Sequence, residues 1–160
     1  IESALRSPVV VATTLVIGAV LFMLVEQFGK KDRDMDELGL KEMAVFAVLQ
    51  ATALIPGASR SGMTIVGGMI QGFTREVSAR ISFLMAVPII FLAGLKKSFD
   101  VVNIGLTISE IAIYLTGIIV SAVVGYITIS YFLKFVAKHS LYWFAAYRLI
   151  LALAVLLFLL

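Results

Sequence analysis

The sequence predicts an all-α, polytopic membrane protein, and its composition and apolar runs carry that prediction. Hydrophobic residues make up 61% of the 160-residue chain, only 14% are charged, and the mean hydropathy is +1.08. Soluble globular domains hold about 25% charged residues. Several apolar runs approach the roughly 20 residues that cross the hydrocarbon core of a bilayer. We expect one membrane domain, 1–160, with four transmembrane helices and one re-entrant helical hairpin.

The first apolar run, 8–28, is long enough to span the bilayer. Pro8 suits the first turn of a helix, where a missing N–H costs nothing. The hydroxyls of Thr13 and Thr14 can bond back to the helix backbone. A polar linker of mixed charge, 29–41, follows this predicted span.

Two shorter apolar runs come next and predict the hairpin. The runs 43–55 and 64–73 have the length of core or re-entrant helices, and Pro56 and Gly57 break the chain between them. A broken helix at membrane depth is tolerated only where the break is buried in protein or lines a wet cavity. We therefore expect a hairpin that dips to the middle of the membrane.

Three further runs, 78–95, 108–135 and 141–160, complete the four predicted crossings, with Pro88 as the expected kink of the first. Small residues recur at four-residue spacing, which lets membrane helices approach closely. These predicted packing seams are Gly68 and Gly72; Ser78, Ser82 and Ala86; and Gly117, Ser121 and Gly125.

The break in the hairpin also predicts an anion site. The segment 58–62, from Ala58 to Gly62, opens the second half of the hairpin, so backbone N–H groups are free at a helix N-terminus whose dipole favours negative charge. Gly57 and Gly62 allow a tight turn and a close approach to a ligand. Hydroxyl donors come from Ser59, Ser61 and Thr64.

Arg60 makes this turn unusual. An isolated arginine at membrane depth costs roughly 3 to more than 10 kcal/mol, so it needs a protein interior, water or an anion around it. Its planar fork of donors suits phosphate oxygens. The alternative is that Ser59 or Ser61 caps a helix, that the glycines serve packing, and that Arg60 snorkels or pairs with a carboxylate.

Other polar residues carry weaker predictions. Gln50 either points into the cavity of the hairpin or bonds a neighbouring helix. Glu26, Asp100 and Glu110 lie near the ends of predicted spans, where we expect interfacial solvation. His139, the only histidine, follows Lys138 in a loop and is expected to be an interfacial residue. No pair of carboxylates has metal-ligand spacing, so no residue of this chain is assigned to a metal.

The run from Pro56 to Thr64, PGASRSGMT, resembles the PGxSRSGxT signature of the undecaprenyl-diphosphatases, the bacitracin-resistance membrane phosphatases of bacteria. The surroundings resemble that family as well. They include Gln50, Gly67-Gly68, the segment 82–88 (SFLMAVP) and Tyr147-Arg148. The resemblance covers essentially the whole chain.

The resemblance implies hydrolysis of undecaprenyl diphosphate to undecaprenyl phosphate and phosphate, which recycles the lipid carrier for peptidoglycan synthesis and gives bacitracin resistance. It implies an inverted repeat of two re-entrant hairpins in the bacterial plasma membrane, of which the second carries the arginine motif. Arg60, Ser59, Ser61 and Thr64 would be catalytic, and Gly57, Ala58, Gly62 and Gln50 would bind the diphosphate lipid.

The resemblance also implies what lies outside this chain. The family's first half carries a glutamate-rich motif, a serine and a histidine, and a divalent cation, Mg or Ca, that this chain has no ligands to hold. We therefore expect the chain to be the C-terminal part of a longer protein and to be inactive alone. A homo-oligomer is left open. The alternative functions are a transporter or flippase for an anionic lipid phosphate, and a structural membrane subunit without a ligand.

Overall fold

The computed structural model describes residues 7–105 and 107–159, and this part of the chain is almost entirely helical. The helices are α2 (Pro8–Phe28), α3 (Leu40–Ala51), α4 (Arg60–Ile70), α5 (Arg75–Ile104), α6 (Ile108–Lys138) and α7 (Tyr142–Leu159). Two short 3-10 helices, η1 (Met35–Glu37) and η2 (Thr52–Leu54), precede and follow α3. One isolated bridge between Arg33 and Phe73 is the β-type pairing found among these residues. The predicted all-α class is confirmed.

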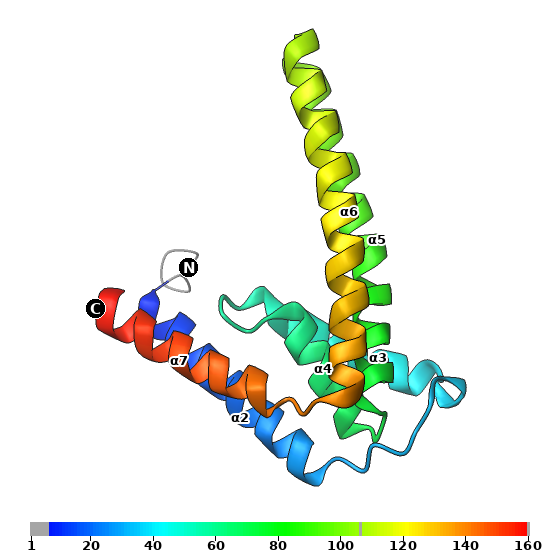
Figure 1. Cartoon of the computed structure of the whole chain (residues 1–160), viewed down its shortest axis with the longest axis vertical. Helices are drawn as coiled ribbons and strands as arrows, with labels where there is room; N and C mark the ends of the chain where they lie inside the picture. The colour runs from blue at the N-terminus through cyan, green and yellow to red at the C-terminus, as the bar shows by residue number, and fades with distance from the viewer. Residues whose placement is uncertain (1–6, 106, 160) are drawn as a thin grey trace.

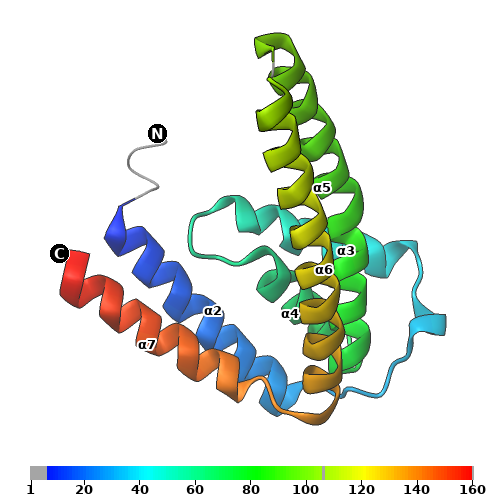
Figure 2. The same cartoon turned by 45° about the horizontal axis from the view of Figure 1, so that its top comes forward.

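The helices form two long pairs with the short hairpin between them (Figure 1). α2 and α7 lie side by side and antiparallel, so that the start of α2 and the end of α7 lie close together. α5 and α6 form a second antiparallel pair, whose far end extends away from the other helices (Figure 2). The hairpin of α3 and α4 fills the space between the two pairs, and α4 packs on α2, α3 and α5.

Three of the helices are long and apolar enough to cross a membrane: Pro8–Phe28, Arg75–Val101 and Ser109–Lys138. The first has the bounds of the predicted run 8–28, and α5 extends beyond the predicted run 78–95 at both ends. Pro88 lies inside α5 without ending it. α7 is a shorter apolar helix within the predicted run 141–160, whose last residue lies outside the described residues.

The second helix of the hairpin begins earlier than the apolar run 64–73 suggested. Ser59 is the N-cap of α4, and its hydroxyl accepts a hydrogen bond from the N–H of Gly62 (3.3 Å). A capping side chain satisfies one of the N–H groups that a helix start leaves without a partner. The cap therefore places Arg60 at the first position of the helix.

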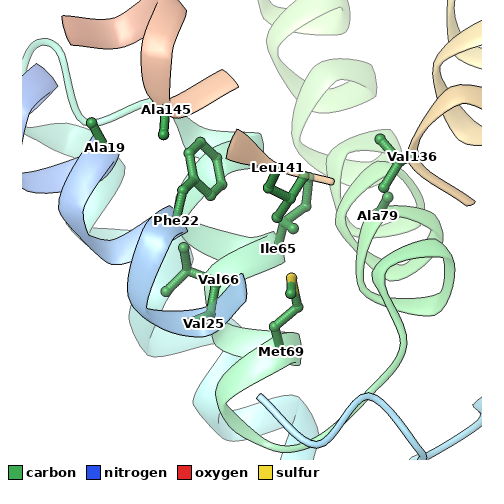
Figure 3. Close-up of a cluster of buried hydrophobic side chains, with 10 residues drawn as sticks. All are labelled: Ala19, Phe22, Val25, Ile65, Val66, Met69, Ala79, Val136, Leu141 and Ala145. Carbon is green, nitrogen blue, oxygen red and sulfur yellow. The ribbon is translucent and has the colours of Figure 1, made fainter. Parts of the chain in front are cut away.

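A single buried cluster joins α2, α4 and the α6–α7 connection (Figure 3). Phe22 and Val25 of α2 pack with Ile65 and Met69 of α4, and Leu141 closes the cluster from the loop before α7. Phe22 is 6% exposed and Met69 fully buried. Contact with Phe22 and Leu141 fixes α4 relative to the two flanking helices.

Only part of the predicted small-residue packing is found. A side chain at Gly68 would overlap Ser78, and Ser78, Ser82 and Ala86 are all buried, so α4 and α5 do meet along this seam. Gly117 and Gly125 of α6 have no atom of a described residue within 4 Å of the position that a side chain would take. The predicted seam on α6 therefore has no partner within residues 7–105 and 107–159.

The prediction that Glu26 lies solvated at an interface is wrong. Glu26 is 6% exposed, and Arg75 binds both of its carboxylate oxygens through Nε at 3.0 and 2.9 Å. The carboxylate also accepts from Lys31 Nζ (3.2 Å) and from the backbone N–H of Leu141 (3.1 Å). Glu26 thus joins the end of α2 to the start of α5 and to the α6–α7 loop.

We predict that Glu26→Gln lowers the free energy of unfolding by about 1–3 kcal/mol, because it removes the charge that Arg75 and Lys31 neutralise and leaves buried donors poorly paired. The measurement is the loss of helical circular dichroism in detergent on titration with SDS. The matched control is Glu76→Gln on the surface of α5, where Glu76 pairs with Arg80 at 3.6 Å and is half exposed. The control is expected to change stability by no more than about 0.5 kcal/mol. Equal effects of both substitutions would contradict the assignment.

Candidate functional site

The turn of the hairpin has an unusual backbone. Gly57 has φ = +87° and Ser59 has φ = +61°. A positive φ is ordinary for glycine but strained for serine, and such strain persists only where the surroundings impose it. Neighbouring residues therefore hold the turn in this conformation.

Two helices hold the turn from outside. Thr14 of α2 donates its hydroxyl to the carbonyl of Pro56 (2.7 Å), and Arg148 of α7 donates Nη2 to the carbonyl of Gly57 (3.0 Å). A side chain at Gly57 would overlap Thr14 and the backbone of Val11. Thr14 lies 14 residues before Phe28, the last residue of α2. The turn therefore contacts α2 about 21 Å from the C-terminal end of that helix, where the linker to the hairpin begins.

The start of α4 presents free donors beside this turn. The N–H of Gly62 bonds the Ser59 hydroxyl, and the N–H of Met63 bonds the Ser59 carbonyl (3.0 Å). The N–H groups of Arg60 and Ser61 have no acceptor among the residues that the structure describes. Unpaired N–H groups at a helix start, together with the helix dipole, attract an anion.

Arg60 adds a full positive charge at the same point. Its side chain is half-buried, and its guanidinium makes no hydrogen bond or ion pair with a described residue. The first turn of α4 contains no acidic residue. A cation at a helix N-terminus is unfavourable by about 0.3–1 kcal/mol, since the dipole is positive there. Helix start and guanidinium together make a locally positive site without a counterion among residues 7–105 and 107–159.

A cavity of about 160 Å³ lies between α2, α4, α6 and α7 next to this helix start. Its polar side is formed by Ser59, Ser61, Gly62, Tyr147 and Arg148. Its apolar side is formed by Phe22, Ile65, Phe132, Leu141 and Phe144. Three predicted site residues thus share this cavity. Arg60 lies at the same turn but does not line the cavity.

Thr64 lies below the helix start and is fully buried. Its hydroxyl shares a 2.5 Å hydrogen bond with the hydroxyl of Ser82 on α5, which is 3% exposed, and lies 2.9 Å from the carbonyl of Arg60. This placement joins α4 to α5 directly beneath the arginine. A substrate could reach the Thr64 hydroxyl only after one of these partners is exchanged.

Two other predicted site residues lie away from the cavity. Ala58 is buried in the turn, and its N–H bonds the carbonyl of Ile55 (3.1 Å). Gln50 of α3 lines a different, mainly apolar cavity of about 460 Å³ between η1, α3 and α5. The Gln50 Oε1 atom is buried without a hydrogen bond to a described residue. The structure does not bring Gln50 to the cavity beside Ser59 and Ser61.

Arg148 is the residue of this site to which the motif analysis gave no role. It is 6% exposed, and besides Gly57 it donates to the backbone carbonyls of Leu15 (3.2 Å) and Thr14 (3.1 Å). Its guanidinium lies 5.9 Å from the ring centre of Phe22. The sequence contains a signal for it, since an arginine inside the apolar run 141–160 carries the same energetic cost as Arg60.

The described residues do not fit the divalent cation that the resemblance implies. Residues 7–105 and 107–159 contain no group of three or more histidine, cysteine, aspartate or glutamate side chains that could hold a metal ion. Glu26, the buried carboxylate near this region, is already bound by Arg75 and Lys31. No step is therefore assigned to a metal held by these residues.

Comparison with known proteins identifies relatives of similar sequence. A family model described as bacitracin resistance protein BacA matches residues 1–154. The undecaprenyl-diphosphatase of Corynebacterium efficiens is 44% identical over 160 residues, which cover 99% of this chain and 55% of that protein. The undecaprenyl-diphosphatase of Rubrobacter xylanophilus is 43% identical over 151 residues, with 94% and 56% covered. The chain spans about half the length of the curated relatives it matches.

The contact of Arg148 with α2 gives a stability prediction. A side chain at Gly18 would overlap the Arg148 guanidinium. We expect Gly18→Ala to displace this group from its three carbonyls and to lower the free energy of unfolding by about 1–3 kcal/mol. The matched control is Gly117→Ala on α6, where the new methyl group meets no described atom within 4 Å.

The control is expected to leave stability unchanged or to raise it by up to about 1 kcal/mol, because alanine favours a helix over glycine. Both variants are compared by SDS titration in the same detergent. If Gly18→Ala is as stable as Gly117→Ala, the guanidinium is not held where the structure places it.

Proposed function

The chain belongs to the bacitracin resistance protein BacA family, and from this premise we propose that it forms the diphosphate-binding part of an undecaprenyl-diphosphatase. The relatives named above carry that enzyme name. In the proposed reaction, water adds to the terminal phosphorus of undecaprenyl diphosphate and the bond to the bridging oxygen breaks. The products are undecaprenyl phosphate and inorganic phosphate, and the carrier lipid is returned to cell-wall synthesis.

One observation carries this proposal: a positive helix start and an arginine without a counterion among the described residues meet at a strained, partly buried turn that α2 and α7 hold. Arg60 makes no ion pair with a described residue, and the N–H groups of Arg60 and Ser61 are free of partners among those residues. Charge placed before the substrate arrives needs no reorganisation during reaction. A phosphate group supplies the missing negative charge.

Each part of the motif then has a physical role in the proposed site. Arg60 neutralises charge on the phosphate oxygens, which is the largest contribution a protein makes to phosphoryl transfer. Ser61 contributes its hydroxyl and N–H, and Ser59 contributes its cap and its hydroxyl at the cavity. Gly57 and Gly62 allow close backbone approach. Thr64 supports Arg60 from beneath through its bond to Ser82.

The proposal also covers the membrane topology of the chain and the catalytic groups that the chain does not supply. We propose four membrane crossings, with α7 as the fourth, and a plasma-membrane location in a bacterium. The proposal assigns any divalent cation, and the group that activates water, to side chains outside this chain. Without them the chain binds a diphosphate but does not hydrolyse it. Bacitracin resistance follows in the proposal from faster recycling of the same lipid.

Arg60→Ala tests the proposed role directly. The chain is grafted onto the Corynebacterium efficiens relative in place of its matching part, and phosphate release from undecaprenyl diphosphate is measured in detergent. Loss of a charge-stabilising donor is expected to lower kcat about 10²–10³-fold. Arg60→Lys is expected to recover only part of this loss, because an ammonium lacks the two-pronged geometry of guanidinium.

The control is Arg80→Ala on α5, whose side chain is mostly exposed and whose ion-pair partner among the described residues is Glu76 (3.6 Å). This control is expected to keep the activity of the unaltered graft. Near-normal turnover by the Arg60→Ala graft would reject the role of Arg60. Movement of the lipid across a vesicle membrane without phosphate release would favour a transporter, which also places helix N-termini toward anionic substrates.

A second experiment concerns the chain alone. We predict that the purified 160-residue chain releases no phosphate from undecaprenyl diphosphate when Mg²⁺ or Ca²⁺ is added, because the described residues hold no metal-binding group. The unaltered graft, prepared in parallel, serves as the positive control. Phosphate release by the chain alone would show that the water-activating group lies within it.

A further inference from the structure

We infer that Arg148 is a second arginine of the phosphate site, which fixes the turn through backbone carbonyls and offers its remaining nitrogen, Nη1, to a phosphate oxygen in the cavity. The inference rests on the proposed function and adds a ligand to the same site. The chemical class of the ligand is a phosphate or diphosphate group, either free or carried by a polyprenyl lipid.

The first argument is charge. Arg148 is 94% buried, since 6% of its surface is exposed, yet no carboxylate of a described residue lies within the 4.0 Å of an ion pair. Three backbone carbonyls, those of Thr14, Leu15 and Gly57, are its hydrogen-bond partners. Carbonyl dipoles solvate a cation only in part, and a buried charge ordinarily requires an opposite charge. An anion in the adjoining cavity would supply it.

The second argument is the use of the donors. Nε bonds Leu15, and Nη2 bonds both Thr14 and Gly57, whereas Nη1 has no hydrogen bond to a described residue. Nη1 is not fully buried. It differs in this from Gln50 Oε1, which is a buried atom without a hydrogen-bond partner among the described residues. An unpaired nitrogen that keeps some exposed surface, on a residue that lines the cavity, is available to a ligand.

The third argument is the set of residues that line the cavity together with Arg148. The same cavity is lined by Ser59, Ser61 and Gly62, which belong to the arginine motif and to the start of α4. A volume of about 160 Å³ is smaller than the roughly 300–1,000 Å³ of pockets that hold whole drug-sized ligands. By volume the cavity has room for a head group and not for the lipid chain attached to it, and its polar donors are confined to the side formed by the start of α4 and by Tyr147 and Arg148.

Arg60 and Arg148 have different roles in this proposed site. Arg60 is half-buried and has no bonded partner among the described residues, so all of its guanidinium donors are open to an arriving phosphate. Arg148 of α7 is anchored to α2 and to the turn, so it can hold Gly57 in place and orient one nitrogen. Gly18 makes the anchoring possible, because any larger residue would occupy the space of the guanidinium.

The test measures binding and contact separately. The full chain is prepared in lipid nanodiscs with ¹⁵N-labelled arginine and titrated with inorganic pyrophosphate and, in a second arm, with farnesyl diphosphate. We expect the Arg148 guanidinium resonances to shift with the same dissociation constant that calorimetry gives. A merely structural arginine would not respond. Tighter binding of farnesyl diphosphate identifies the lipid as the preferred carrier of the head group, and equal binding identifies the free phosphate chemistry.

The variants are Arg148→Met, Arg148→Lys and Ser61→Leu, with Arg80→Met as the matched control. We expect Arg148→Met to weaken pyrophosphate binding about 10-fold or more, as loss of a charged hydrogen bond does, and Arg148→Lys to recover part of it. Ser61→Leu fills the cavity without altering Arg148 and is expected to abolish the shift of its resonances. That variant carries the test if Arg148→Met does not fold. Arg80→Met is expected to bind as the unaltered chain does.

The outcomes separate this inference from the function on which it rests. If Arg60→Ala abolishes binding while Arg148→Met binds normally and the Arg148 resonances stay fixed at saturation, Arg148 is structural and the inference fails alone. If the unaltered chain binds neither probe, the proposed function fails together with it. Shifted Arg148 resonances with weakened binding in Arg148→Met and Ser61→Leu support the inference.

Discussion

The structure depends on one constraint, which is that backbone groups outside a regular helix have to find hydrogen-bond partners elsewhere in the protein where no water reaches them. The turn between η2 and α4 is irregular, partly buried backbone that meets α2 at Thr14, and its carbonyls cannot be paired by a regular helix. Thr14 donates a hydrogen bond to the carbonyl of Pro56, and Arg148 donates one to the carbonyl of Gly57. Because these partners come from α2 and α7, the turn can exist only where those two helices lie together. The pairing of α2 with α7 and the position of the hairpin are therefore one solution to one problem.

Buried charge is compensated differently at the C-terminal end of α2 and at its middle. Toward its C-terminal end, Glu26 meets Arg75, Lys31 and the Leu141 N–H, so that positive and negative groups compensate each other. Toward its middle, Arg148 meets carbonyls alone among the described residues. A buried ion pair of this kind links elements of the fold, and removing one partner leaves the other as an uncompensated buried charge. A buried cation without a counterion is unfavourable, and an anion bound in the adjacent cavity would lower its free energy.

The sequence predicted the features that depend on local pattern. The run 8–28 gave α2 its bounds, and the apolar runs around Pro56 and Gly57 predicted two short helices at a break. Features that depend on distant partners were missed or misjudged. Glu26 was taken for a solvated residue because Arg75, 49 positions later, cannot be placed beside it from the sequence. For Gln50 the sequence leaves open whether the side chain points into the hairpin cavity or bonds a neighbouring helix, and the structure places it at another cavity between η1, α3 and α5. Arg148 received no role, since its three carbonyl partners lie up to 134 positions away.

The same reasoning explains why Ser59 rather than glycine can precede Arg60 despite its positive φ. The strain of order 1–3 kcal/mol that such a backbone stores is opposed by three contacts of this turn: the cap to Gly62, the bond from Thr14 to Pro56 and the bond from Arg148 to Gly57. A turn fixed by its neighbours on both sides keeps the first N–H groups of α4 aimed in one direction before any ligand arrives. Preorganised donors contribute more to binding a phosphate than donors that have to be ordered by it. The contact between α7 and α2 is thus connected to the proposed phosphate site at Arg60 through a turn of five residues, 55–59.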